Sequence, residues 1–569
     1  MAMKGLLPNA LVILVIMSFL LIVNSVIVTT AYSATPSAVP VSNIQFQLPE
    51  VEITSAIPYD HGLVLTLEYV NISSITSLQN SQSQLLVCFV NSSMKYQMYS
   101  STVSSVSGII STVLNGNLIV IVESSNSGNP QSIVYNFSGL HFEDYYTLNG
   151  IILTNEPPSY NLTYLSLIQY SSNFRNANYT LLFPNGKVTF KDELPVFALQ
   201  LPEGILVLAY NVTYLYTSNN PIIPYNLTLL SNNGQIIWTN SYYLSYYSPQ
   251  ILYGGITFSS TLINYAILGN TLYITNSTML KSGNSFTIVN ESLLGISLSN
   301  GDLINSFQVS PNTVGLGTTQ GTLYGIVFQH EGVTVTSPVK YVIVQKYESG
   351  NIYPVVKIPF KERTVLKNIT APNGKVTSFN YTQPLTNIFV SDGNFILVSS
   401  PETGSSGSNV TVIHGDNVYS YTLDFEVTQS LTPNSMILLG NSSDNYYLLF
   451  LNPNGSMKYY YNIGKISNAN LLGIISLVGV KIAQVSPECY YVAYTSTYSN
   501  PSSLLPGTQV NIDLITFNSS LVSSVHPPTT TSNSNTSSPS PLSSTLILIL
   551  VVIVIAVIVG LIYINKRGF

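Results

Sequence analysis

Charge is scarce in this sequence. Asp, Glu, Lys and Arg make up only 7% of the 569 residues, whereas ordinary soluble proteins carry about 25%. Disorder does not follow, because 46% of the residues are hydrophobic and the net charge is only -6. The acidic balance, without an evident basic cluster, argues against a nucleic-acid partner.

Two explanations account for this scarcity of charge. In an acidic exterior, carboxylates with reference pKa values of about 4 would be largely neutral, and a chain rich in Lys and Arg would repel itself. Alternatively, a glycan-covered β protein needs little charge for solubility, since its 40 Tyr and many Ser, Thr and Asn supply uncharged polar groups. The first explanation predicts a protein that stays folded near pH 3.

Catalytic motifs are also missing. His330-Glu331 lacks the second His of a zincin, and Asp392-Gly393 lacks the neighbours found in aspartic proteases. The segment Gly404–Gly407 is not a nucleophile elbow, and no Walker loop or Cys-x-x-Cys is present. We therefore assign no catalytic residue, cofactor or metal ligand, and the sequence leans towards a protein that is not an enzyme.

The two ends of the chain predict the cellular location of the protein. Residues 1–33 combine Lys4, an apolar run and small residues before a cut after Ser33, which is typical of a secretory signal or of an uncleaved signal-anchor. Residues 546–564 are apolar, uncharged and long enough to cross a hydrocarbon core of about 30 Å.

The short tail, 565–569, carries Lys566 and Arg567, and the positive-inside rule places it in the cytoplasm. Residues 526–545 are rich in Ser, Thr and Pro and resemble an O-glycosylated stalk, or a plain disordered linker. The sequence thus predicts a single-pass protein of the cell membrane with an extracellular body.

The body, 43–525, reads as an all-β ectodomain. Short runs of Val, Ile, Leu, Tyr and Thr alternate with Gly, Asn, Pro and Ser, without a long helical period. One hairpin pattern recurs, in which an Asn-Gly turn of expected type I′ is followed by an apolar residue and then an aromatic one. Its copies are at Asn185-Gly186, Asn233-Gly234, Asn300-Gly301, Asn373-Gly374 and Asn454-Gly455.

These hairpins resemble the outer hairpins of PQQ-like β-propellers. The resemblance implies a propeller of about seven or eight blades, at roughly 60 residues a blade. Quinoprotein enzymes of that family keep a docking Trp in nearly every blade, whereas Trp238 is the only Trp here, which speaks against quinone chemistry. A series of β-sandwich domains is the alternative. The order of signal, body, stalk and anchor is similar to that of membrane-anchored surface proteins of archaea.

The only two cysteines, Cys88 and Cys489, lie near the two ends of the body. Outside the cell they could form a disulfide that ties the first blade to the last. They could equally be two buried free thiols, since Cys88 lies in an apolar strand-like run.

Sixteen Asn-x-Ser/Thr sequons are candidate glycosylation sites. They are Asn71, Asn91, Asn136, Asn161, Asn178, Asn211, Asn226, Asn276, Asn290, Asn368, Asn380, Asn409, Asn441, Asn454, Asn518 and Asn535.

Four small groups of polar residues could ligate a metal or line a cleft, although exposed turns are the simpler interpretation. In a propeller, several of them could meet at the central channel. They are Asp60-His61, His141 with Glu143 and Asp144, His330-Glu331, and His414 with Asp416.

Three functions fit these observations. The first is a non-enzymatic cell-surface glycoprotein that presents its β body for surface assembly, adhesion or binding of protein or glycan partners, for which abundant Tyr is suited. The second is a membrane-anchored hydrolase of polysaccharide or peptide at acidic pH, which would need two carboxylates across a cleft. The third is a substrate-binding receptor, a class that normally has helices.

Overall fold

The computed structural model describes most of residues 39–516. The gaps are 49–50, 70–81, 105, 127–128, 154–161, 171–176, 214–221, 246–264, 283–284, 333–336, 371–375, 392–393, 401–406, 433–434, 443–444, 453, 466–478, 487–488 and 499–506. All of these residues belong to one compact unit, Met1–Ser523. The expected signal, stalk and membrane span lie outside the described residues. No helix among the described residues is long and apolar enough to cross a membrane.

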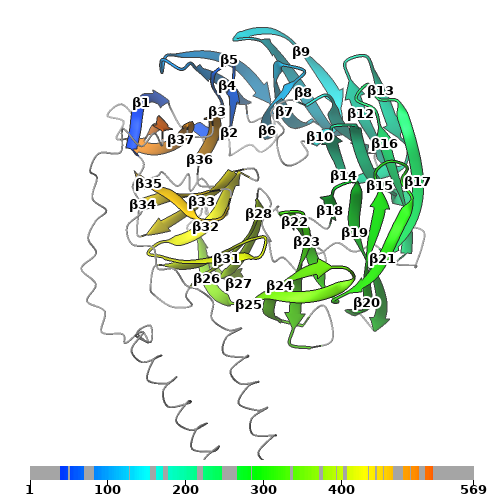
Figure 1. The fold of residues 1–569 in the computed structure, drawn as a ribbon. Coiled ribbons are helices and arrows are strands. Elements are labelled where there is room, and N and C mark those ends of the chain that lie inside the picture. Colours follow the sequence, from blue (N-terminus) through cyan, green and yellow to red (C-terminus); the bar gives the residue numbers. More distant parts are fainter. Residues whose placement is uncertain are drawn as a thin grey trace, which may run out of the picture. The chain divides into compact units, whose positions relative to one another are not determined.

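The described strands form nine four-stranded antiparallel sheets, which we number as blades 1 to 9 (Figure 1). Blade 1 comprises β2 (Val51–Tyr59), β3 (Gly62–Tyr69), β4 (Gln82–Val90) and β5 (Tyr96–Ser104); blade 2 comprises β6 (Val106–Leu114), β7 (Asn117–Asn126), β8 (Asn129–Ser138) and β9 (His141–Asn149). Blade 3 comprises β10 (Ile151–Leu153), β11 (Leu165–Tyr170), β12 (Ala177–Phe183) and β13 (Gly186–Phe190); blade 4 comprises β14 (Glu193–Leu201), β15 (Gly204–Asn211), β16 (Ile222–Leu230) and β17 (Ile236–Ser245). Blade 5 comprises β18 (Tyr265–Leu268), β19 (Thr271–Ser282), β20 (Ser285–Ser297) and β21 (Leu303–Val309); blade 6 comprises β22 (Thr313–Thr319), β23 (Thr322–His330), β24 (Val339–Glu348) and β25 (Asn351–Pro359). Blade 7 comprises β28 (Thr386–Ser391), β29 (Asn394–Ser399), β30 (Ser408–His414) and β31 (Asn417–Leu423); blade 8 comprises β32 (Glu426–Thr432), β33 (Ser435–Ser442), β34 (Asn445–Leu451) and β35 (Met457–Lys465). Blade 9 comprises β36 (Val480–Ser486), β37 (Cys489–Tyr498), β38 (Gly507–Thr516) and, as its fourth strand, β1 (Val39–Leu48).

Strand β1 closes the ring by joining the last sheet from the other end of the described chain. It pairs with β38 along its whole length, with Asn43 opposite Asp513. The buried Asp513 carboxylate accepts hydrogen bonds from the Asn43 amide and, at 2.7 Å, from the Tyr461 hydroxyl of blade 8. One carboxylate therefore connects β1, blade 9 and blade 8.

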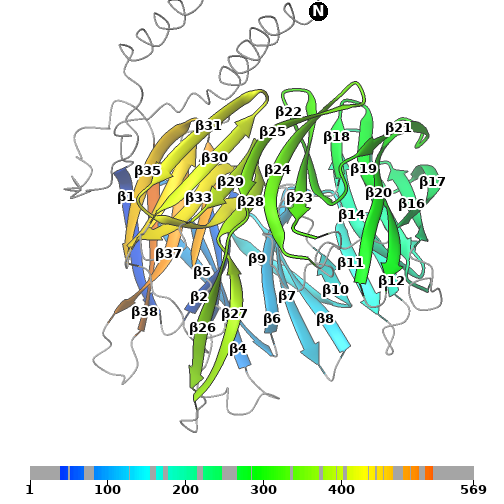
Figure 2. The same cartoon turned by 90° about the horizontal axis from the view of Figure 1, so that it is seen from below.

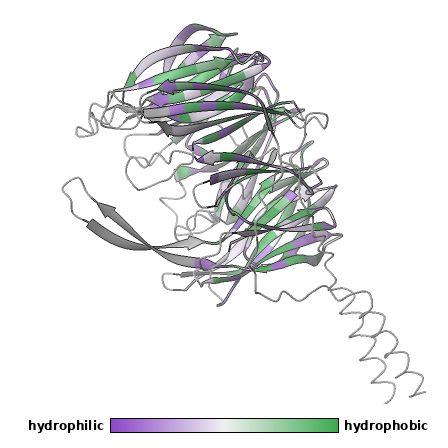
Figure 3. Ribbon diagram, turned by 90° about the vertical axis from the view of Figure 1, so that its left-hand side faces the viewer, coloured by the Kyte–Doolittle hydropathy of each residue, from purple (hydrophilic) through white to green (hydrophobic). Residues whose placement is uncertain are grey.

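Nine hydrophobic clusters lie between successive blades, one at each junction of the ring. The cluster between blades 9 and 1 includes Phe46, Leu65 and Val510, all buried. Corresponding clusters join blades 1 and 2, 2 and 3, 3 and 4, 4 and 5, 5 and 6, 6 and 7, 7 and 8, and 8 and 9. Hydrophobic residues alternate with polar ones along the strands (Figure 3), as expected when each face of a sheet packs on the next sheet. The body is thus a β-propeller, and the sandwich alternative is wrong.

The expected seven or eight blades are wrong, because there are nine. The sequence count assumed roughly 60 residues a blade. The strands of blade 7 span only Thr386 to Leu423, so more blades fit into the body. The variable spacing of the hairpins concealed this, since long connections separate some blades and single residues separate others.

The Asn-Gly turns also differ from the expectation. Gly234, Gly301 and Gly455 have positive φ angles, but Asn233, Asn300 and Asn454 do not. The strand register shifts beside each turn, which is typical of a longer turn that ends in a glycine bulge rather than of type I′. Paired positive φ angles occur instead at other hairpins, such as Asn115-Gly116.

Between blades 6 and 7 the chain makes an additional hairpin of β26 (Glu362–Thr370) and β27 (Val376–Pro384). These two strands pair only with each other among the described residues. Figure 2 shows them as a separate ribbon beside the blades.

Trp238, which occupies the aromatic position of the hairpin pattern, docks on the next blade. Its indole Nε1 donates to the Leu298 carbonyl at 3.0 Å, and its ring lies against Gly301, where an added Cβ would come within 2.7 Å of it. Phe183 lies against Gly234 of the following blade in the same way. At Trp238 the aromatic position of the pattern therefore contacts the next blade, whereas Phe183 makes its contact from before the turn at Asn185-Gly186.

Gly301→Ala tests this docking. Both Gly301 (φ 74°) and Gly116 (φ 83°) have positive φ, but nothing lies within 4 Å of a Cβ at Gly116. Gly116→Ala should cost only the backbone strain of about 1–2 kcal/mol. Gly301→Ala should cost about 1–3 kcal/mol more in the free energy of unfolding, because Trp238 must also move. Urea unfolding of both variants measures this, and equal losses would contradict the docking contact.

Candidate functional site

The four polar groups found in the sequence lie in different blades. Asp60 and His61 form the exposed turn between β2 and β3, with φ angles of 47° and 58°. His141, Glu143 and Asp144 lie on β9, the outermost strand of blade 2, and all three are exposed. The group on β9 therefore lies away from the central channel.

The other two groups are engaged in local structure. His330 Nδ1 lies 2.6 Å from the Ser337 carbonyl, and burial lowers the pKa of this imidazole. His414 Nδ1 lies 2.8 Å from the Asn394 side-chain oxygen. Asp416 accepts from Lys346 at 3.0 Å.

The structure therefore does not bring these groups together at the channel. Among the described residues there is no cluster of three or more His, Cys, Asp and Glu that could hold a metal ion.

Buried carboxylates at the blade junctions form a feature that the sequence analysis missed. Glu291 of β20 is only 1% exposed. Its carboxylate accepts from the Thr313 backbone N–H at 2.9 Å, where the chain crosses into blade 6, and from the Ser277 hydroxyl at 3.0 Å. Burial dominates over these hydrogen bonds and raises the pKa of Glu291 to about 7.

At two other junctions, where the chain passes from one blade to the next, an uncharged side chain accepts the corresponding backbone hydrogen bond. Ser408 accepts from the Val427 N–H at 2.9 Å between blades 7 and 8. Ser132 accepts from the Ile152 N–H at 3.1 Å between blades 2 and 3. Each acceptor lies on the third strand of its blade, as Glu291 does, so Glu291 is an ionisable version of a repeated structural contact.

Three further carboxyl groups have raised pKa values for the same main reason. Burial raises the pKa of Glu68, Glu123 and Glu193. Hydrogen bonds from Ser83 to Glu68 and from Asn226 to Glu193 oppose this rise without cancelling it. The protonated forms of these groups are thus favoured over a wider range of pH than usual.

Both cysteines are free thiols in the structure. Cys88 is buried in the cluster between blades 9 and 1, and burial raises the pKa of its thiol to about 12. Cys489 is half-buried at the start of β37. The disulfide stays a prediction for a non-reducing gel.

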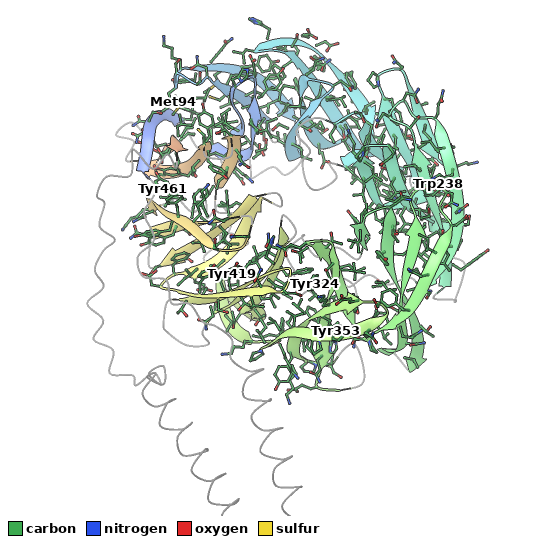
Figure 4. The ribbon with its side chains drawn as sticks, viewed as in Figure 1. Met94, Trp238, Tyr324, Tyr353, Tyr419 and Tyr461 are labelled. Carbon is green, nitrogen blue, oxygen red and sulfur yellow. The ribbon has the colours of Figure 1, made fainter. Side chains whose placement is uncertain are left out.

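The exposed hydrophobic side chains gather on the outermost strands of the blades, which we call the rim. Of the thirteen large hydrophobic residues that are exposed within the described part of the chain, ten lie there: Tyr96, Phe142, Tyr145, Tyr146, Ile236, Ile237, Tyr243, Leu303, Ile304 and Tyr353. Tyr243 is 70% exposed and Tyr145 is 63% exposed. The outward orientation of the rim around the ring is visible in Figure 4, where Tyr353 and Trp238 are labelled.

Consecutive blades repeat this exposure. Ile236 and Ile237 follow the turn at Gly234 in blade 4, and Leu303 and Ile304 follow the turn at Gly301 in blade 5. All four are more than half exposed. Exposed apolar groups at equivalent places of neighbouring blades are typical of a binding surface rather than of isolated surface residues.

Basic residues are concentrated in one part of the chain, contrary to the sequence analysis. Residues 340–375 hold seven of the 18 Lys and Arg but only two acids, Glu348 and Glu362. A count in short windows would have revealed this. Its described part covers the outer half of blade 6 and β26, the first strand of the additional hairpin.

Comparisons with known proteins add no activity. No protein-family model matches the chain, and no curated protein matches it. Among solved structures, the β-propeller domain of the Trilobed protease from Pyrococcus furiosus is 8% identical, with 79% of this chain and 90% of that chain covered and a TM-score of 0.26. A mutant of the Synechocystis apocarotenoid oxygenase is 7% identical, with 75% and 94% covered and a TM-score of 0.30. An uncharacterized protein from Listeria monocytogenes is 12% identical, with 60% and 91% covered and a TM-score of 0.30.

The buried Glu291 carboxyl should make stability depend on pH. Its pKa of about 7 in the folded chain lies above the ordinary glutamate value of 4.5. The folded chain therefore binds the proton more tightly than the unfolded chain between these two pH values. The free energy of unfolding should therefore fall by about 3 kcal/mol as the pH rises from 4.5 to 7.

Urea midpoints measured across this range check the effect. Glu291→Gln keeps an acceptor for the Thr313 N–H and should flatten the dependence, whereas Glu143→Gln, at an exposed carboxylate, should leave it unchanged. A Glu291→Gln variant with the same slope as the parent chain would contradict the assignment.

Proposed function

We propose that this protein is a non-enzymatic cell-surface protein whose β-propeller binds protein or glycan partners through its rim. The exposed aromatic and aliphatic side chains of the outermost strands are the observation that carries this proposal. A Tyr side chain offers an apolar face and a hydroxyl, which suits both sugar rings and polar protein surfaces. The rigid sheets behind the rim hold these side chains in place without a cost in ordering loops.

The surface location rests on the sequence. The signal at 1–33, the stalk at 526–545 and the apolar run at 546–564 support a body held outside the cell by one C-terminal span. The sequons support glycosylation of that body. Asn91 and Asn290 are exposed and accessible to modification, whereas the Asn226 amide already donates to Glu193.

The raised carboxyl pKa values support an acidic exterior. Glu68, Glu123, Glu193 and Glu291 all shift towards the protonated form. In mildly acidic surroundings a protein loses little stability from burying such groups, because their raised pKa values keep them largely neutral there.

Cells that express full-length variants test the binding role. Ile236→Ser, Ile237→Ser and Tyr243→Ser together remove exposed rim side chains from blade 4. The matched control removes three exposed valines that are not on the rim, Val196, Val289 and Val485. The rim variant should reduce adhesion of cells to one another and to polysaccharide-coated surfaces by about tenfold, as loss of an interface centre does.

Protease treatment of intact cells measures how much of each variant is displayed outside. Equal display with unequal adhesion supports the proposal. Undiminished adhesion by the rim variant would contradict the binding role, and hydrolysis of polysaccharide or peptide by the purified chain would contradict the non-enzymatic role. A body that is protected from protease would contradict the surface location.

A further inference from the structure

The rim carries opposite charges on opposite sides of the ring. On the outer half of blade 6, Lys340 and Lys357 are exposed and both approach the ring of Tyr341, with Nζ at 5.8 and 4.0 Å from its centroid. Tyr353 lies with Lys357 on the outermost strand β25 and is 49% exposed, whereas Lys340 and Tyr341 lie on the neighbouring strand β24. We call these four residues the basic rim. Neither lysine forms an ion pair with another described residue, since the two ion pairs found both belong to Lys346.

The acidic counterpart is β9 of blade 2. Among the nine outermost strands, β9 alone contains Asp or Glu, namely the adjacent Glu143 and Asp144. Both are exposed, and they lie among the exposed Phe142, Tyr145 and Tyr146. We call these five residues the acidic rim. Its carboxylates form no ion pair among the described residues.

The two patches match in chemistry. Each combines unpaired charges with exposed aromatic rings, and the charges are of opposite sign. Ammonium groups attract both carboxylates and the faces of aromatic rings. The basic segment 340–375 lies in a chain whose net charge is -6, so a second copy of this chain is itself an acidic partner.

The positions of the two patches on the ring decide the shape of the assembly that contact between copies would form. Blade 2 is four blades from blade 6 in one direction and five in the other, so the two patches lie on opposite sides of the ring (Figure 1). Contact between two different patches on opposite sides is heterologous and does not close on a pair of molecules. It would extend into a row of propellers.

We propose that the basic rim of one copy binds the acidic rim of a second copy, so that the propellers assemble side by side in rows. This inference rests on the proposed role at the cell surface and identifies one partner of the rim as the protein itself. Several exposed charge pairs must act together here, because a single exposed ion pair contributes little to binding. The assembly should weaken as added salt screens the charges.

Charge reversal on the full-length chain tests the contact. Sedimentation of the purified chain in a non-ionic detergent at low ionic strength should show concentration-dependent association. Lys340→Glu with Lys357→Glu, or Glu143→Lys with Asp144→Lys, should each raise the dissociation constant more than about tenfold. The chain with all four substitutions should associate like the parent, because its rims again carry opposite charges.

A matched control reverses Lys458 and Lys465 on β35, the outermost strand of blade 8. It changes the net charge as much as the basic-rim variant does and should leave association intact. Failure of the fourfold variant to recover, an equal loss in the control, or no association of the parent chain would each overturn the proposal. A different result would also overturn the proposal. If no reversal affects association but the basic-rim variant loses binding to a sulfated polysaccharide, the basic rim binds a glycan instead.

This outcome is separable from the proposed function. Adhesion is measured with the uncharged substitutions in blade 4, which touch neither charged patch. Loss of self-association with normal adhesion concerns only the contact between copies, whereas loss of adhesion with normal self-association concerns only the wider binding role.

Discussion

The pairing of β1 with β38 is the constraint on which the rest of the fold depends. Every blade has two apolar faces and covers one with each neighbour, so an open row of sheets would leave a bare face at each end. Strand β1 completes blade 9, and the cluster containing Phe46 then covers the face of blade 1. Asp513 reinforces the junction, because it binds both the joining strand and blade 8.

Closure also explains where polar groups are tolerated. The chain crosses from the outermost strand of one blade to the innermost strand of the next, and the N–H groups at these crossings need acceptors inside the structure. Serine supplies them at Ser132 and Ser408, whereas Glu291 supplies one at the price of a carboxyl that prefers to be protonated. Because these contacts constrain the buried residues, the side chains that can change without disturbing the fold are those of the rim, which extend outward from fixed strands.

The sequence predicted the all-β class, the repeated hairpins and the propeller architecture, because turn glycines and alternating strands depend on local residues. It did not predict nine blades, since blade length depends on connections that carry no strand pattern. Nor could it predict the burial of Glu291, which follows from contacts with Ser277 and Thr313 across two blades. The histidines do not converge because they lie in different blades, and His141 lies on an outermost strand. The uneven distribution of lysine was visible in the sequence, but only the fold shows which charges share the rim.

Hydrogen exchange of the β38 amides is the most direct measurement of ring closure. An interior strand has partners on both sides, whereas an outermost strand leaves alternate N–H groups open to solvent. Strand β38 is interior only because β1 pairs with it. In a closed ring, β38 should exchange as slowly as β24, which is interior in blade 6, and more slowly than the outermost β9. Exchange of β38 at the rate of β9 would show instead that the ring is open.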